Sequence, residues 1–304
     1  MVDAVVLIAF GGPMARDEIR PFLANVTRGR RISAERLEEV AHHYERMPGG
    51  RSTLNDLTLA QARALGEALA RRGAFMEVRV GMRNWRPYLH ETLAQLAERG
   101  VRRCLGVIMS SLRCEASWDR YQQDVAEARA RTGGVPDVVF APPWGREPGF
   151  IDALVERADA ALGGVAADGR RWTPLIFTAH SIPVPMADAS PYVEDFTAVA
   201  RAVATKLDHA RWSLAYQSRS GRPEDPWLEP DVNTVIRSLA RDGERDAVVV
   251  PVGFVCDHVE VLYDLDVEAA ETARAGGLTL HRAATVGDHP AFIESLADLV
   301  VSAA

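Results

Sequence analysis

Short hydrophobic runs alternate with amphipathic segments along the whole chain. The runs predict strands, and the segments between them carry apolar residues at helical spacing. We expect strands near residues 1–10, 76–81, 104–110 and 138–140, and again near 174–179, 212–217, 247–253 and 278–281. This alternation is typical of parallel sheets flanked by helices, so the pattern predicts an α/β fold.

The alternation is interrupted at Pro142 and Pro143, and a glycine-rich stretch at 163–169 follows the next helical segment. We therefore expect two Rossmann-like domains, residues 1–142 and 143–304, each with a parallel sheet flanked by helices, which together enclose a cleft. Extra helical segments between the first two strands exceed what a simple crossover requires, and such insertions often carry function.

The most unusual pattern is an acidic segment, residues 257–271, which we predict to be a helix starting near Asp257. At ~100° per residue, Glu260, Asp264 and Glu268 share one narrow face with Glu271. The segment holds six carboxylates and His258, and it contains no Lys or Arg. Like charges stacked at this spacing destabilise a helix, so something must relieve the repulsion.

A bound cation or protons would do so, and oxygen ligands with an imidazole suit divalent iron, manganese or magnesium. A solvated acidic face explains the same spacing, and spacing alone favours that interpretation. A site needs a second group, and His180 supplies one at the end of the strand at 174–179, where open α/β sheets bind ligands. Ser181 beside it makes no triad, and no GxSxG motif occurs.

Composition limits the class of protein. The chain has 304 residues, 47% of them hydrophobic and 25% charged, as in soluble globular proteins. A net charge of −7 argues against nucleic-acid binding. The three cysteines form no CxxC pair, so we expect reduced thiols and neither a zinc site nor an iron–sulfur cluster. No apolar run reaches the ~18 residues of a membrane span and no signal peptide is evident, so we expect a cytoplasmic protein.

Six phrases occur in an order that resembles the ferrochelatase family, and the resemblance extends from Val5 to the C-terminus. They are FGGP at 10–13, GMRNWRP at 81–87, AHSIP at 179–183, YQSRSG at 216–221, DPWL at 225–228 and PVGFVCDHVE at 251–260.

The resemblance implies two Rossmann-like domains with a porphyrin between them, and a last helix, about 290–303, packed on the N-terminal domain. It implies insertion of Fe(II) into coproporphyrin III or protoporphyrin IX with release of two protons, a terminal-stage step of haem biosynthesis. His180 matches the catalytic histidine, and Glu260 matches the glutamate that faces it across the macrocycle. Asp264 and Glu268 match acidic residues on a path toward solvent, so these four residues form the expected metal-contacting set.

The resemblance also suggests partners for the porphyrin. Arginine pairs well with propionates because its fork is bidentate. Trp227 is equally compatible with a hydrophobic lid and with a pinned loop. The expected substrate-binding residues are Phe10, Arg28, Arg30, His43, Tyr44, Ser52, Tyr121 and Trp227.

The chain departs from the family pattern at three places. Phe10 stands where many Gram-positive relatives have a tyrosine that can touch iron, which leaves His180 more exclusively responsible. Thr53 replaces a proline, and residues 110–115 (SSLRCE) differ from the version that lies over the porphyrin in relatives. The short form without a lip insertion favours coproporphyrin III over protoporphyrin IX.

Two other functions compete with iron insertion. A cobalt or sirohydrochlorin chelatase would lack the phrases at 216–221 and 225–228. A porphyrin or haem carrier would need an axial ligand but not Glu260 as well. We therefore expect an enzyme whose partners are porphyrin and ferrous iron, with iron as substrate and no tightly bound cofactor. We expect a monomer that makes at most transient contact with neighbouring enzymes of the haem pathway.

Overall fold

The computed structural model describes residues 2–29, 32–134, 136–221 and 224–304. The chain divides into two compact units. The first comprises the residues up to Met109 with Trp118–Pro142 and Leu296–Ala304, and the second comprises Ser110–Ser117 and Pro143–Ser295. The segment after the third strand therefore belongs to the second unit, and the end of the chain belongs to the first.

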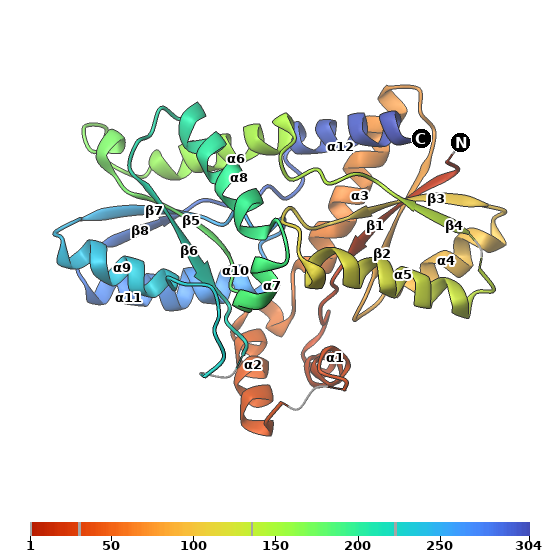
Figure 1. The fold of residues 1–304 in the computed structure, drawn as a ribbon, viewed down its shortest axis with the longest axis horizontal. Coiled ribbons are helices and arrows are strands. Elements are labelled where there is room, and N and C mark those ends of the chain that lie inside the picture. Colours follow the sequence, from red (N-terminus) through yellow and green to blue (C-terminus); the bar gives the residue numbers. More distant parts are fainter. Residues whose placement is uncertain (1, 30–31, 135, 222–223) are drawn as a thin grey trace. The chain divides into compact units, whose positions relative to one another are not determined.

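The first unit is built on a sheet of parallel strands in the order β2-β1-β3-β4. Alternate residues of the fully buried β1 pack against α4 and α5, and α3 covers the other face (Figure 1). This is the doubly covered parallel sheet that the pattern predicts. The elements are β1 (Ala4–Ala9), β2 (Glu77–Met82), β3 (Arg103–Ile108), β4 (Asp137–Phe140), α3 (Leu54–Arg71), α4 (Leu89–Glu98) and α5 (Arg120–Arg131).

Between β1 and β2 the chain also forms the 3₁₀ turns Arg16–Glu18 and Pro48–Gly50 and the helices α1 (Ile19–Val26) and α2 (Ala34–Arg46). The hydroxyl of Ser33 accepts a hydrogen bond from the amide of Arg36 at 3.2 Å, so Ser33 is the N-cap of α2.

The second unit repeats the architecture with parallel strands in the order β6-β5-β7-β8. Helices α6 and α8 lie on one face, and α9 and the acidic segment on the other (Figure 1). The elements are β5 (Leu175–His180), β6 (Trp212–Gln217), β7 (Asp246–Val250), β8 (Thr279–Arg282), α6 (Pro148–Leu162), α7 (Val184–Asp188), α8 (Tyr192–Lys206) and α9 (Val232–Arg241), with a 3₁₀ turn at Arg170–Trp172. The last helix, α12 (Pro290–Ala303), begins in the second unit and ends in the first.

The acidic segment differs from the predicted helix in two ways. It begins with α10 at Val259, two residues later than expected, because His258 is in an extended conformation and caps the helix. It then continues as a π-helical segment, η5 (Leu262–Ala269), before α11 (Ala270–Ala275). A pattern of carboxylates four apart fits both windings, so periodicity could not separate them. A turn that closes i→i+5 is wider than an α turn and marks functional sites in many helices.

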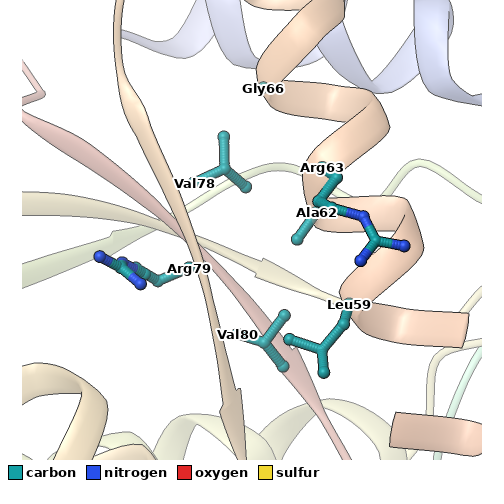
Figure 2. Close-up of a pocket in the computed structure, with 7 residues that line it drawn as sticks. All are labelled: Leu59, Ala62, Arg63, Gly66, Val78, Arg79 and Val80. Carbon is teal, nitrogen blue, oxygen red and sulfur yellow. The ribbon is translucent and has the colours of Figure 1, made fainter. Parts of the chain in front are cut away.

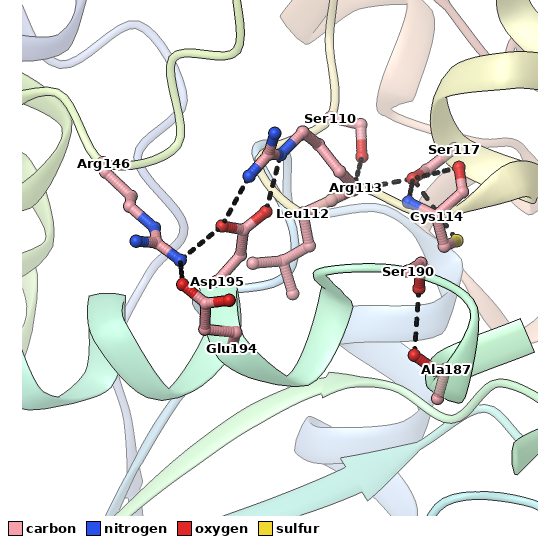
Figure 3. Close-up of polar contacts among 10 residues, drawn as sticks. All are labelled: Ser110, Leu112, Arg113, Cys114, Ser117, Arg146, Ala187, Ser190, Glu194 and Asp195. Carbon is pink, nitrogen blue, oxygen red and sulfur yellow. Dashed lines mark hydrogen bonds and ion pairs between the residues drawn. The ribbon is translucent and has the colours of Figure 1, made fainter.

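Residues 110–117 are anchored in the second unit by a buried carboxylate. Asp195, 3% exposed, receives the Nε and NH2 groups of Arg113 at 2.8 and 3.1 Å and the NH2 group of Arg146 at 2.7 Å. Figure 3 shows both guanidinium groups directed at Asp195 at the start of α8. This ion pair explains why an arginine stands at position 113, because it balances the charge of Asp195, which would be costly to bury alone.

A surface cavity of about 290 Å³ lies in the first unit between α3 and the edge strand β2 (Figure 2). Its lining is Leu59, Ala62, Arg63, Gly66, Val78, Arg79 and Val80, which includes none of the predicted site residues. Among the described residues no helix is both long enough and apolar enough to cross a membrane.

Two glycines give opposite predictions for stability. A Cβ on the buried Gly145 would lie 1.9 Å from the carbonyl oxygen of Ser111, whereas one on Gly66 in α3 would meet only Val78 at 3.8 Å. We expect Gly145→Ala to cost about 3 kcal/mol through overpacking. The control Gly66→Ala should stabilise the protein by up to about 1 kcal/mol, since alanine favours a helix. Thermal unfolding measures both, and equal melting temperatures for the two variants would contradict the packing around Ser111.

Candidate functional site

His180 is the last residue of β5, where its orientation is set by backbone contacts. Its Nδ1 lies 2.5 Å from the carbonyl oxygen of Ser181, which can only accept, so we assign the proton to Nδ1. The Nε2 atom of the neutral ring then keeps an unshared lone pair. The buried Tyr192 donates from its hydroxyl to the carbonyl of His180 at 2.8 Å. Burial raises the pKa of Tyr192 well above 10, so this phenol stays a donor.

Glu260 is brought beside His180 by the neighbouring strand. Gln217 pairs with His180 in the sheet register, and its side-chain Nε2 donates to the carbonyl of Glu260 at 2.6 Å. The Nδ1 atom of His258 accepts from the amide of Glu260 at 3.2 Å. Burial lowers the pKa of His258, which keeps the ring neutral and able to accept. Gln217 and His258 thus fix the backbone carbonyl and the backbone amide of Glu260, at the first turn of the acidic segment.

The Nε2 atom of His180 and the Oε1 atom of Glu260 are 3.9 Å apart. A flat ring needs about 3.5 Å to the atoms on each face, so groups on opposite faces stand roughly 7 Å apart. As the two side chains lie in this structure, the gap between them is too narrow for a ring. The prediction that Glu260 faces His180 across the macrocycle would therefore require one of the two side chains to move.

Asp264, one turn further along the segment, accepts a hydrogen bond from the hydroxyl of Ser218. Burial raises its pKa to about 8, and the charges of Glu260 and Glu268 add to the rise. The hydrogen bond from Ser218 acts in the opposite direction and is outweighed. At neutral pH Asp264 is therefore largely protonated, and it can both take up and release a proton.

The acidic segment contains no Lys or Arg of its own, but a cation from another element of the fold contacts its carboxylates. Arg282 at the end of β8 pairs with Asp266 through Nε at 2.5 Å and with Asp257 through NH1 at 3.1 Å. Sequence analysis missed this partner because it lies in the next strand. The six carboxylates therefore have different partners: Arg282 neutralises Asp257 and Asp266, Glu260 lies beside His180, and Asp264 is bound by Ser218.

Glu268 is exposed at the far end of η5. Among the described residues, no group of three or more His, Cys, Asp or Glu side chains is close enough to hold a metal ion. His180, Glu260, Asp264 and Glu268 therefore do not form a closed coordination shell in this structure.

The predicted substrate-binding residues of the first unit differ in how far their side chains are exposed. In the first unit Phe10 is 37% exposed beneath the guanidinium of Arg83, whereas Tyr44, Ser52 and Tyr121 are buried. His43 is half-buried, and burial lowers its pKa. The exposed Arg28 donates to the side chain of Asn25 at 2.6 Å, and Arg30 lies outside the described residues.

Trp227 belongs to a pinned loop. Its neighbours pair with the segment after β5, since the amide of Val184 donates to Pro226 and that of Leu228 to Ile182, both at 3.0 Å. The indole lies close enough to Gly221 that a Cβ there would meet its Nε1 at 2.1 Å. The backbone contacts fit the pinned-loop interpretation, and the lid interpretation stays a prediction.

Four residues with a part in this geometry were not assigned one from sequence: Gln217, Ser218, Tyr192 and Arg282. Gln217 and Ser218 lie in the phrase YQSRSG, at the carboxyl end of β6 beside His180, so strand-end position could have found them. Tyr192 and Arg282 act through contacts distant in sequence, which give no local signal.

The sequence model of the ferrochelatase family matches residues 2–304. The coproporphyrin III ferrochelatase of Frankia alni is 43% identical, with 98% of this chain and 79% of the relative covered. That of Mycolicibacterium smegmatis is 39% identical, covering 98% and 88%. The ferrochelatase of Rhodopirellula baltica is also 39% identical, covering 98% and 85%.

Solved structures of chelatases share the architecture. SirB from Bacillus subtilis with Fe³⁺ gives a TM-score of 0.60 at 12% identity, covering 99% of this chain and 95% of that one. CbiX, the terminal enzyme for biosynthesis of sirohaem in denitrifying bacteria, gives 0.56 at 13% identity, covering 99% of both chains. At these identities the likeness shows the fold alone.

We predict that Asp264→Asn stabilises the protein more at pH 9 than at pH 5. The unfolded chain loses this proton near an ordinary pKa of about 4, whereas the folded chain keeps it until about pH 8. Stability therefore falls as pH rises through this window, because the unfolded state binds fewer protons. Asparagine stays neutral and still accepts from Ser218.

Melting temperatures in metal-free buffer at the two pH values measure this effect. The control is Glu271→Gln, which removes an exposed carboxylate from the same segment. An equal gain for Asp264→Asn at both pH values would contradict the raised pKa.

Proposed function

Because the chain belongs to the ferrochelatase family, whose members insert iron into porphyrin in haem biosynthesis, we propose that its porphyrin is coproporphyrin III. The chain is thus an iron-inserting enzyme rather than a carrier or a cobalt chelatase. Relatives named for coproporphyrin III, about 40% identical over nearly the whole chain, support this substrate.

The reaction requires a base and a route for protons. Insertion of Fe²⁺ forms bonds from iron to the pyrrole nitrogens and breaks two pyrrole N–H bonds, so two protons must leave. Proton transfer needs an acceptor within hydrogen-bond reach whose pKa is close to the working pH. The single observation that carries our proposal is the pairing of the bare Nε2 of His180 with the carboxylate of Glu260 at 3.9 Å.

His180 takes a pyrrole proton on Nε2 and becomes an imidazolium, which the adjacent Glu260 stabilises. Transfer of the proton to Glu260 returns the imidazole to its neutral form for the second pyrrole proton. Asp264, with a pKa of about 8, and the exposed Glu268 then pass protons to solvent.

The same carboxylates suit the delivery of hydrated iron. Carboxylates bind a hard divalent cation weakly and exchange it with water. The lack of a closed metal shell among the described residues fits a metal that passes through and is released to the porphyrin. In this proposal Glu260, Asp264 and Glu268 contact iron transiently.

Of the two arginines expected to bind a porphyrin carboxylate, Arg28 lies within the described residues and Arg30 does not. The guanidinium of Arg28 is exposed and carries one neutral partner, Asn25, so it remains able to form a bidentate pair. The exposed ring of Phe10 offers an apolar surface for a flat macrocycle. The buried Ser52, Tyr44 and Tyr121 support the surrounding structure in our proposal, because their side chains are covered.

The proposed substrate is tested by anaerobic Fe²⁺ insertion into coproporphyrin III and protoporphyrin IX in parallel, followed by loss of porphyrin fluorescence. We expect faster turnover of coproporphyrin III. Preference for protoporphyrin IX would overturn the proposed substrate, and binding of both porphyrins without turnover would favour a carrier.

In the same assay we expect Glu260→Gln and His180→Ala each to lose iron insertion by at least about 100-fold, the lower range for a proton-transfer group. Porphyrin binding, measured by quenching of intrinsic fluorescence, should stay largely unchanged. Activity within a few-fold of the parent would remove the altered residue from the mechanism.

A further inference from the structure

Arg282 makes an unusually complete set of contacts for an arginine at a strand end. Its Nε and NH2 groups bind the two carboxylate oxygens of Asp266 at 2.5 and 3.0 Å. Its NH1 group binds Asp257 at 3.1 Å and the carbonyl of Ala283 at 3.2 Å. The side chain of Arg282 is only 18% exposed, so this pairing is better shielded than an ordinary surface ion pair.

These contacts span residues 257–266, the first two thirds of the acidic segment. Asp257 precedes the cap residue His258, and Asp266 lies in the middle of η5. Asp257 is also held by the amide of Thr285 at 3.1 Å, just beyond β8. One guanidinium therefore joins the entry of the helix and its π-helical part to the edge strand of the sheet.

The winding of η5 decides which side chains lie beside His180. An α turn has 3.6 residues, whereas a π turn closes one residue later, so rewinding would rotate each following side chain about the helix axis. Glu260 and Glu268 carry like charges on this segment, and Asp264 adds to their repulsion whenever it ionises, which favours loosening of the helix. Within the described chain Arg282 is the cation that pairs with carboxylates of this segment at two points.

We propose that Arg282 is a positioning residue for iron insertion. It holds Asp257 and Asp266 on one guanidinium, which keeps η5 in its π winding and keeps Asp264 in line with Glu260 beside His180. Arg282 touches neither of these site carboxylates in the hydrogen bonds and ion pairs of the described residues, so it acts through the backbone of the segment. The catalytic consequence rests on the proposed function, whereas the effect on winding does not.

The kinetic test compares Arg282→Gln with Arg282→Lys and Asp266→Asn. We expect Arg282→Gln to lower kcat for iron insertion about tenfold, as for other residues that orient the groups in direct contact with a metal or substrate. The KM for porphyrin should stay within about twofold, since the ring-binding groups are untouched. Arg282→Lys should recover part of the loss, because it keeps the charge but not the fork. Asp266→Asn should reproduce the loss with Arg282 present.

The winding itself is tested by hydrogen exchange of the purified protein without substrates. In Arg282→Gln, the amides of residues 262–269 should exchange at least about tenfold faster, while those of β5 and β6 keep their parental rates. The control is Arg274→Gln, which removes an exposed arginine of α11 for which the structure shows no ion pair among the described residues.

The two measurements separate the possible failures. The proposal is supported if Arg282→Gln shows both slower turnover and faster exchange of residues 262–269, and Arg274→Gln shows neither. Faster exchange with unchanged kcat, or a lower kcat with unchanged exchange, overturns it. If the parent inserts iron into neither porphyrin, the proposed function fails, and the exchange rates still decide whether Arg282 holds the segment. If Arg282→Gln does not fold, Asp266→Asn carries both measurements.

Discussion

Six carboxylates within fifteen residues are the constraint around which the second unit is built. Their repulsion would loosen a solvent-exposed helix, and the fold relieves it in different ways. Arg282 neutralises Asp257 and Asp266, while burial keeps Asp264 protonated near neutral pH. Glu260 is then left facing His180. We propose that this division, with two carboxylates held by Arg282 and Glu260 beside His180, is what suits the segment to metal and protons.

The sheet supplies the other half of the site. β5 and β6 end side by side, so His180 and Gln217 are neighbours, and Gln217 reaches the backbone of Glu260. The backbone of Ser181 orients the imidazole, and Tyr192 holds the carbonyl of His180. The distance between base and carboxylate thus follows from strand register and backbone hydrogen bonds, which are among the stiffest features of an α/β fold.

Sequence patterns predict much of this arrangement, including the order of strands and helices along the chain and the position of His180 at a strand end. They did not predict the π winding of η5, because carboxylates four apart fit both helix types. They also missed Arg282, whose partners lie in a different element. The family resemblance placed Glu260 opposite His180 across the ring, whereas the 3.9 Å between the two side chains supports our proposal that they act from one side.

The central claim is that His180 and Glu260 act together from one side of the porphyrin. A crystal structure of the enzyme with metal-free coproporphyrin III tests this most directly. We expect the Nε2 atom of His180 and the carboxylate of Glu260 to approach the pyrrole nitrogens from the same face of the ring. A ring bound between the two side chains, with one on each face, would contradict the account.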